Sequence, residues 1–160
     1  MTGSGSIRPA NETDAERLAE IEIFNYRLNF YPIFHEDTYY FDELRVSRLA
    51  AAYRKEPRLL AGTHVYDDGV VKGFLRVRNA EIEKLFVEPM FQRAGIGTAL
   101  LTDALNGALA SKPETLLWAL EKNTSAIRFY ARHGFHPTGE RKRVADTDEF
   151  LVRLIRFQGD

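Results

Sequence analysis

The 160-residue sequence contains no cysteine, and this absence removes several kinds of chemistry at once. Disulfides, thiolate metal sites and a cysteine nucleophile are all excluded, so an acyl-cysteine intermediate cannot form. Four histidines are present, but their spacing does not suit a metal site. We therefore expect no metal cofactor. The histidines are His35, His64, His133 and His136.

An excess of charge and a long apolar run are also missing. Lys and Arg number 22 against 23 Asp and Glu, which gives a formal net charge of -1. Such a balance offers no electrostatic attraction for nucleic acid, and no basic segment suits an anionic membrane. No stretch is long enough to span a bilayer or resembles a signal peptide. We expect neither nucleic acid nor a membrane as a partner. We expect a cytoplasmic location.

What is present is an ordinary globular composition, with 44% hydrophobic and 28% charged residues. A chain of this length fits one domain that buries roughly two-thirds of its unfolded surface. We assign that single domain to residues 7–160. The Gly- and Ser-rich residues 1–6 are expected to form a flexible leader.

The first half of the domain predicts a short strand at Ile7–Pro9 and then two helices. A capping box at Thr13–Glu16 begins the first helix, and Pro32 ends it. The second helix runs from Asp37 to Lys55, before Pro57. Its expected inner face consists of Leu44, Leu49 and Ala52.

The second half alternates strands with helices. Asp67-Asp68-Gly69 predicts a hairpin between strands 59–66 and 70–78. Further strands are expected at 80–87, 115–120, 135–143 and 150–157. One helix is expected from Gly95 to Leu109, with Ala108 on its buried stripe. Another is expected from Thr124 to His133, and Gly134 ends it. The order β-α-α-β-β-β-α-β-α-β-β predicts an α+β fold around one mixed sheet.

The most informative segment, 83–101, reads as a strand, a glycine turn and an apolar helix. A helix that begins there directs unpaired N–H groups and a positive dipole end above the strand. Gly95 and Gly97 remove side chains that would block a phosphate. The pattern predicts binding of a cofactor that carries a pyrophosphate.

Two familiar phosphate loops do not match. A dinucleotide fingerprint needs a third small residue where this chain has Leu100, and a Walker loop needs Lys where it has Thr98. The pattern that fits is Gln92-Arg93-Ala94-Gly95-Ile96-Gly97. It resembles the acetyl-coenzyme A loop of the GNAT N-acetyltransferase superfamily.

A second signature strengthens this resemblance. Residues 123–135 resemble the superfamily pattern Asn-x-x-Ala-x-x-Phe-Tyr followed by Gly-Phe, and Ile7–Ala10 looks like its first strand. The likeness runs over nearly the whole chain. It implies a three-layer α+β fold with a mostly antiparallel sheet, in which two parallel strands splay apart and admit the cofactor.

The resemblance assigns roles in binding acetyl-CoA. The backbone of Leu85, Phe86 and Val87 would pair with the pantetheine arm, and the Val87 N–H would polarise the thioester carbonyl. The N–H groups from Arg93 to Thr98 would hold the pyrophosphate. Gln92 would shape the loop, and Asn123 would bind pantetheine or simply form the turn. The other matched positions are Ala94, Gly95, Ile96, Gly97, Ala126, Phe129 and Tyr130.

For catalysis, the resemblance makes Tyr130 the general acid that protonates the departing thiolate, since a phenol is protonated at neutral pH. A strand glutamate is the candidate base. Glu81 matches the family position more closely, whereas Glu83 lies nearer the presumed thioester. Both share a face with Val87 unless a bulge intervenes.

The resemblance implies acetyl transfer to a primary amine of a small molecule or peptide, by direct attack in a ternary complex. A non-catalytic acyl-CoA sensor and a longer acyl donor remain alternatives. Segment 30–43, rich in aromatic and acidic residues, would either line the acceptor cleft and suit a cationic amine or pack on itself. The tail Phe150–Phe157 would be a free edge for a homodimer or an inner strand.

Overall fold

The computed structural model describes residues 5–159 and contains one seven-stranded sheet. The strand order is β1-β2-β3-β4-β5-β7-β6, and every neighbouring pair is antiparallel except β4 and β5. The α+β fold is therefore confirmed. The strands are β1 (Ser6–Pro9), β2 (Thr63–Asp67), β3 (Val71–Arg78), β4 (Glu81–Val87), β5 (Glu114–Leu120), β6 (His136–Arg143) and β7 (Phe150–Phe157).

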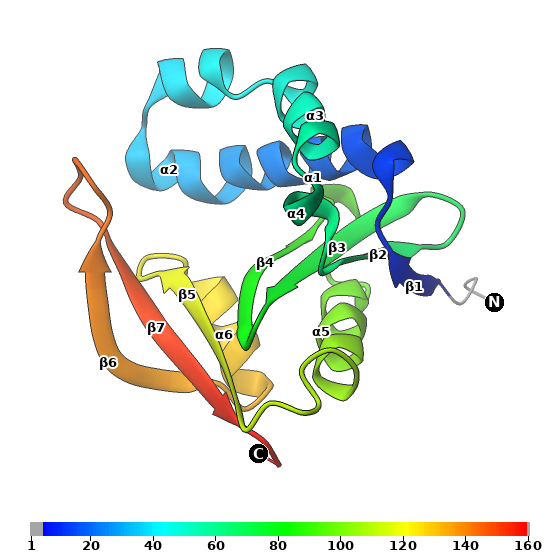
Figure 1. The fold of residues 1–160 in the computed structure, drawn as a ribbon. Helices are drawn as coiled ribbons and strands as arrows, with labels where there is room; N and C mark the ends of the chain where they lie inside the picture. Colours follow the sequence, from blue (N-terminus) through cyan, green and yellow to red (C-terminus); the bar gives the residue numbers. More distant parts are fainter. Residues whose placement is uncertain (1–4, 160) are drawn as a thin grey trace.

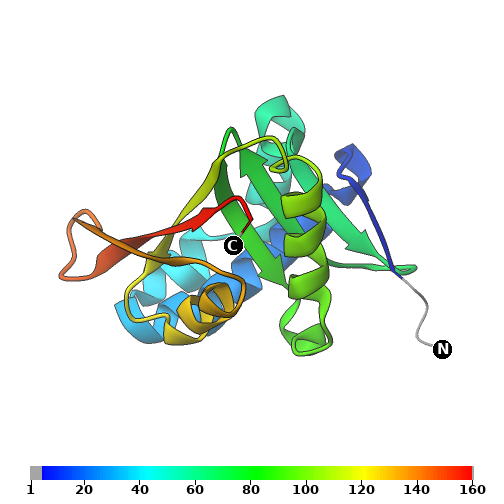
Figure 2. The same cartoon turned by 90° about the horizontal axis from the view of Figure 1, so that it is seen from below.

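Helices cover both faces of the sheet, as Figures 1 and 2 show. One face carries α1 (Ala15–Asn25), α2 (Tyr31–Phe34) and α3 (Val46–Lys55), and the other carries α5 (Ile96–Asn106) and α6 (Thr124–Arg132). Two buried apolar clusters result, one on each face. The first contains Leu18, Ile21, Tyr53 and Phe74, and the second contains Ile82, Leu100, Leu101, Leu117 and Tyr130.

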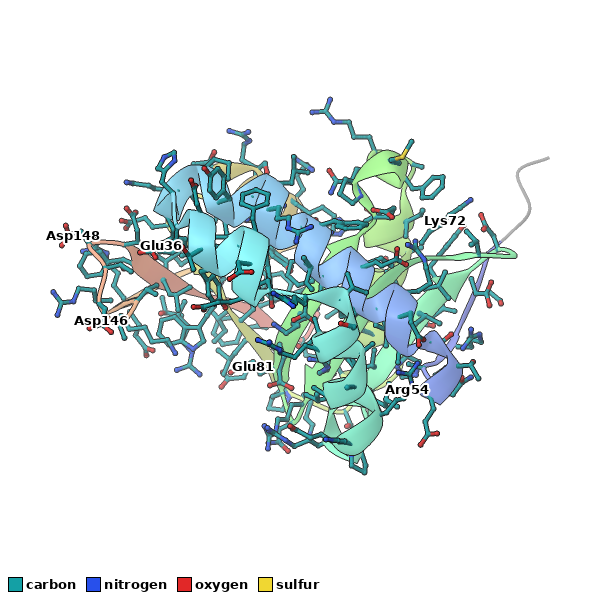
Figure 3. All side chains as sticks on the ribbon, turned by 90° about the horizontal axis from the view of Figure 1, so that it is seen from above. Glu36, Arg54, Lys72, Glu81, Asp146 and Asp148 are labelled. Carbon is teal, nitrogen blue, oxygen red and sulfur yellow. The ribbon has the colours of Figure 1, made fainter. Side chains whose placement is uncertain are left out.

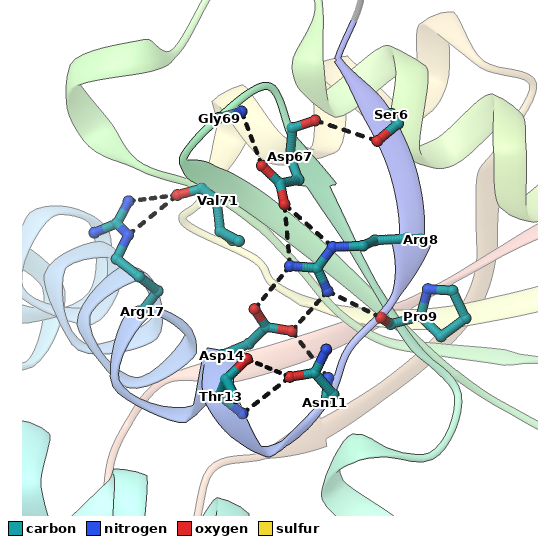
Figure 4. A network of polar contacts seen from close by, with 10 residues as sticks. All are labelled: Ser6, Arg8, Pro9, Asn11, Thr13, Asp14, Arg17, Asp67, Gly69 and Val71. Atoms are coloured by element: carbon teal, nitrogen blue, oxygen red, sulfur yellow. Dashed lines mark hydrogen bonds and ion pairs between the residues drawn. The ribbon is translucent and has the colours of Figure 1, made fainter.

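The chain enters α1 through a network of polar contacts that Figure 4 shows. The capping box is Asn11–Asp14: the Asn11 side chain accepts from the Thr13 N–H, and Asp14 accepts from the Asn11 N–H at 2.9 Å. The predicted box at Thr13–Glu16 is thus wrong, because a turn of 3-10 helix precedes α1. Ser6, which the sequence assigned to the leader, lies in β1 and pairs with Asp67 of β2. Residues 1–4 lie outside the described part.

Pro32 does not end the first helix, contrary to the prediction. A π-helical segment, η2 (Tyr26–Phe30), follows α1 directly, and the Tyr31 N–H donates to the Tyr26 carbonyl. Pro32 then lies in the first turn of α2, where its missing N–H costs little. The helix ends instead at His35, which has a positive φ of 54°.

The second helix is shorter than predicted. A π-helical segment, η3 (Tyr39–Glu43), stands apart from α3, because Leu44 and Arg45 are extended. The buried side chains of α3 are Ala50 and Tyr53. Of the predicted inner face, Leu49 packs against the same core cluster, Ala52 is only half-buried, and Leu44 precedes the helix. Lys55 is its last residue, and Pro57 begins the short α4 (Pro57–Leu60), in a segment predicted as strand.

Several boundaries later in the chain agree with the sequence. The hairpin turn, β4, α6 and both final strands lie where they are expected, and Gly134 after α6 has a φ of 90°. Helix α5 ends earlier than predicted, at Asn106, so that Ala108 is exposed whereas Leu109 remains buried. β7 is an inner strand between β5 and β6, which excludes the free-edge alternative for the tail. No helix in residues 5–159 is both long and apolar enough to cross a membrane.

The feature that positions the site is the parallel pair β4 and β5. Their only register pair joins Glu81 to Leu116, near the start of each strand. Beyond it the two strands diverge toward α1 and α2, as Figure 1 shows. The splayed strands expected from the resemblance are therefore present.

Candidate active site

Two adjoining cavities open where β4 and β5 diverge. The loop-side cavity has a volume of about 390 Å³ and borders the glycine turn before α5. The second cavity, of about 350 Å³, lies between the strands and the α1–α2 segment. The two share five lining residues, so they meet in the middle of the splay. These are Leu85, Phe86, Asn123, Ala126 and Tyr130.

The glycine turn has the backbone form that the sequence implied. Gly95 has a φ of 82°, which a side chain would strain, and it stands immediately before α5. Arg93 also has a positive φ, of 66°. A Cβ on Gly97 would lie 3.5 Å from the Phe129 ring, so a larger side chain would fill the cavity. The free N–H groups at the start of α5 suit a phosphate.

A buried asparagine supports the floor of the loop-side cavity. Asn25 is 2% exposed, and its Nδ2 donates to the Val87 carbonyl at 2.9 Å. The Gln92 Nε2 lies 3.3 Å from both the Asn25 Oδ1 and the same carbonyl. Gln92 therefore links the loop to β4 and α1. Sequence reasoning missed Asn25, although a polar residue among the apolar positions of a helix was a usable signal.

At the start of α6, Asn123 acts as the helix N-cap. Its Oδ1 accepts from the Ala126 N–H at 3.4 Å. The side-chain NH2 has no hydrogen-bond partner within residues 5–159, and Asn123 lines both cavities. One side chain thus forms the turn and leaves a donor for a ligand, so the two alternatives for Asn123 are compatible.

Tyr130 stands at the junction of the two cavities. It is 9% exposed and packs edge-on against Phe129 and Phe135, at ring distances of 5.3 and 5.5 Å. Burial raises the pKa of its phenol well above the usual value of 10. The group is therefore protonated at neutral pH, as a proton donor must be.

Glu81 does not share a face with Val87, because a bulge intervenes. Arg76 pairs with Lys84 but Val77 pairs with Ile82, which leaves Glu83 as the extra residue of β4. Glu83 lines the second cavity, and its carboxylate lies 4.0 Å from the Arg78 guanidinium. Glu81 lines neither cavity. The bulge thus distinguishes Glu83 from Glu81, the two candidate general bases between which the sequence did not decide.

In the aromatic segment 30–43, some side chains line the second cavity and others pack on one another. Phe30 and Phe34 line the second cavity together with Tyr26. Tyr31, in contrast, packs against Tyr40 and Phe41 at ring distances of 5.9 and 5.0 Å. None of the segment's acidic residues lines this cavity. In the view of Figure 3, Glu36 lies on the same side of the molecule as Asp146 and Asp148 of the β6–β7 turn. The segment therefore adds no acidic side chain to the cavity lining.

Most of the predicted cofactor residues come together around the loop-side cavity. Ala94 and Ile96 do not line it, and Ile96 is instead 5% exposed within the core. Ser125 and Arg132 line it without having been predicted. The described residues contain no group of three or more His, Cys, Asp or Glu side chains arranged for a metal ion.

His133 connects the two helices beside this cavity. Its Nε2 lies 3.3 Å from the Thr98 hydroxyl, and its ring is 4.8 Å from that of Phe129. Burial, with Arg132 and Arg156 nearby, lowers the pKa of the imidazole. A neutral His133 can donate a hydrogen bond to Thr98 or accept one from it, so the first turn of α5 is joined to the end of α6.

Comparison with known proteins places this architecture in a class. PaiA N-acetyltransferase from Thermoplasma acidophilum, solved in complex with coenzyme A, superposes with a TM-score of 0.68. The match is 20% identical and covers 96% of this chain and 99% of that one. The fold is thus that of N-acetyltransferase domains.

Sequence matches over part of the chain point to the same class of protein. A model described as "Acetyltransferase (GNAT) domain" matches residues 60–137. An uncharacterized N-acetyltransferase of Methanocaldococcus jannaschii is 44% identical over 57 residues, 35% of this chain and 25% of that protein. A probable N-acetyltransferase of Mycobacterium tuberculosis is 43% identical over 61 residues, 37% of this chain and 33% of that protein. The chain thus spans a quarter to a third of these curated relatives. Residues 60–137 are thus similar to GNAT acetyltransferase domains.

Proposed function

We propose that this chain transfers an acetyl group from acetyl-CoA to a primary amine of a small molecule or peptide, by direct attack within a ternary complex. The observation that carries the proposal is the meeting of two cavities at Tyr130. One cavity has the features of a cofactor site and the other is free for an acceptor. Holding two reactants side by side removes much of the entropic barrier to their reaction.

The loop-side cavity would take the cofactor. Its pyrophosphate would lie on the N–H groups from Arg93 to Thr98, with the Arg93 side chain as a charged contact. The pantetheine arm would follow β4 along Leu85, Phe86 and Val87. The coenzyme A bound by the Thermoplasma acidophilum protein, which has the same fold, supports this assignment.

In the reaction, the amine lone pair attacks the thioester carbonyl, and the C–S bond breaks as the tetrahedral intermediate collapses. Tyr130 would give a proton to the departing sulfur, and the Val87 N–H would stabilise the developing oxyanion. Glu83 would accept the proton that the amine loses, directly or through water, since it lines the acceptor cavity whereas Glu81 does not.

The cytoplasmic location and the homodimer stay predictions. β6 is an edge strand of the sheet and its residues are all exposed. If the chain dimerises through its sheet, the β6 edge is therefore a suitable surface.

The first test is isothermal titration with acetyl-CoA, CoA and NAD. We expect the two CoA species to bind and NAD not to bind, because the turn lacks the third small residue of a dinucleotide fingerprint. A lack of binding to both CoA species would contradict the proposal. Release of free CoA is then measured against a panel of primary amines, since a sensor would bind the cofactor without releasing CoA above background.

A further inference from the structure

We propose that the acceptor is an amine with an apolar body and a carboxylate, that is, an apolar amino acid, and that Lys84 binds its carboxylate. This inference rests on the proposed function, because it concerns the acceptor cavity of the same site. It depends on a network of charges that joins this cavity, where Lys84 is part-exposed, to the buried interior of the α1–α3 layer.

The network begins at Lys84, whose side chain lines the acceptor cavity and is 27% exposed. The Lys84 Nζ donates to the Tyr26 hydroxyl at 2.6 Å and lies 3.6 Å from the Glu22 carboxylate. The Tyr26 hydroxyl in turn donates to Glu22 at 2.7 Å. An ammonium group has three hydrogens, and these contacts occupy at most two of them.

The interior end of the network holds a second cation. The Tyr53 hydroxyl donates to Glu22 at 2.6 Å and accepts from the Arg76 guanidinium at 2.6 Å. Arg76, which is 3% exposed, also donates to the Thr63 hydroxyl. Glu22 is 5% exposed and is the only carboxylate among these contacts.

The network therefore contains two cations and one carboxylate, an excess of one positive charge. A charge held away from water is costly unless an opposite charge accompanies it. Arg76 is enclosed, whereas Lys84 faces the cavity. A bound carboxylate beside Lys84 would balance the network and use the ammonium's remaining hydrogen.

The rest of the cavity fits such an acceptor. Within residues 5–159, Glu83 and Lys84 are the only charged residues that line this cavity, so one anion and one cation face the ligand. Two other cations approach Trp118, but Lys142 is exposed, Arg153 pairs with Glu140, and neither lines the cavity. The walls are otherwise mostly apolar or aromatic: Phe30, Phe34, Ile82, Leu117, Trp118, Leu120, Val144 and Leu151.

The test uses Trp118, the only tryptophan, as a reporter of cavity occupancy that needs no turnover. Its fluorescence is titrated with 3-phenylpropanoate and with the neutral isostere 3-phenylpropanamide, and isothermal titration is run in parallel. We expect the wild type to bind the carboxylate at least tenfold more tightly. Lys84→Met should reduce that ratio to within twofold, whereas Lys84→Arg should retain a preference.

Lys55→Met is the matched control, because Lys55 is exposed at the end of α3 and away from the cavity lining. It should keep the wild-type ratio. The inference is overturned if neither probe binds, if the wild type shows no preference, or if Lys84→Met retains it. Lys84→Met leaves Arg76 and Glu22 balanced, and if it fails to fold, the wild-type ratio still decides. Failure here leaves the CoA titration intact, so it is distinguishable from failure of the proposed function.

Discussion

At the scale of single residues, Tyr130 combines burial with access to both cavities. Aromatic neighbours fix its ring, and burial raises the pKa of its phenol, so the proton remains available across the neutral range. A buried tyrosine in a core cluster is ordinary. What distinguishes Tyr130 is its position where the loop-side cavity and the second cavity meet.

Replacing Tyr130 with Phe removes only the hydroxyl. We expect kcat to fall by roughly 10²–10⁴, the usual contribution of a positioned proton donor. CoA affinity measured by titration should change by less than about threefold, since the ring keeps its packing. An unchanged kcat would remove Tyr130 as the acid.

The two strand glutamates give a matched pair. Glu83→Gln should lower kcat/KM by at least about tenfold if this carboxylate accepts the amine's proton, and the loss should be largest at neutral pH. Glu81→Gln should leave the rate near that of the wild type, because Glu81 lines neither cavity. The reverse ranking, measured across pH 6–9, would assign the base to Glu81.

At the scale of elements, the entry into α1 depends on charged contacts among β1, the capping turn and β2. The Arg8 guanidinium donates two hydrogen bonds to Asp14 at 2.9 Å and one to Asp67 at 3.1 Å (Figure 4). Burial alone would raise the pKa of the Asp14 carboxyl. Its bonds from Arg8 and the Asn11 N–H outweigh burial, so that the pKa is lowered. Asp14 is therefore stabilised in its charged form.

Asp14→Asn should lower the free energy of unfolding by about 1–3 kcal/mol, because Arg8 loses its main partner in a part-buried site. Because the pKa of Asp14 is lower in the folded than in the unfolded chain, its contribution is present above the unfolded value of about 3.9 and disappears as the pH falls below it. Urea unfolding of wild type and variant should therefore converge at acid pH. Glu56→Gln, which breaks an exposed ion pair with Arg58, is the control. A constant difference between wild type and Asp14→Asn down to pH 2 would contradict this account.

At the scale of the whole molecule, the splay of β4 and β5 determines where ligands fit. A regular parallel pair would close the sheet and leave no room between α1 and α6. The single register pair at Glu81 and Leu116 anchors one end, and the divergence creates both cavities. Ligand binding should therefore stabilise the whole fold.

A hundredfold excess of CoA over its Kd should stabilise the folded state by about 2.7 kcal/mol. For a chain of this size that corresponds to a rise in Tm of roughly 5–11 °C. Gly97→Glu should abolish the shift, because its side chain would enter the cavity beside Phe129 and repel phosphate. Ala108→Glu, on the exposed turn after α5, adds the same charge elsewhere and should retain it. A full shift in Gly97→Glu would refute the loop assignment.

Some elements were predictable because their signals are local. Asp67-Asp68-Gly69 predicted the hairpin, and Gly134 predicted the end of α6. The alternating tail predicted β7 with the bounds that the structure has. The failures lie where tertiary packing overrides a local signal. Pro32 lies in the first turn of α2, because a π-helical segment continues α1 up to it. In the aromatic segment 30–43, some side chains line the second cavity and others pack on one another.

By itself the sequence determined the α+β fold and the glycine turn, which predicts a cofactor that carries a pyrophosphate. These depend on residue types at fixed spacing along the chain, which short-range sterics and helix geometry dictate. The family resemblance added acetyl-CoA and Tyr130 as the proton donor to test. Only the tertiary structure decided which glutamate lines the acceptor cavity, because a single extra residue at Glu83 reverses the parity of the strand. It alone also brought Glu22 to Lys84 and Arg76. The two cations pair across β3 and β4, and Glu22 reaches them through Tyr26 and Tyr53 only when α1 packs on the sheet.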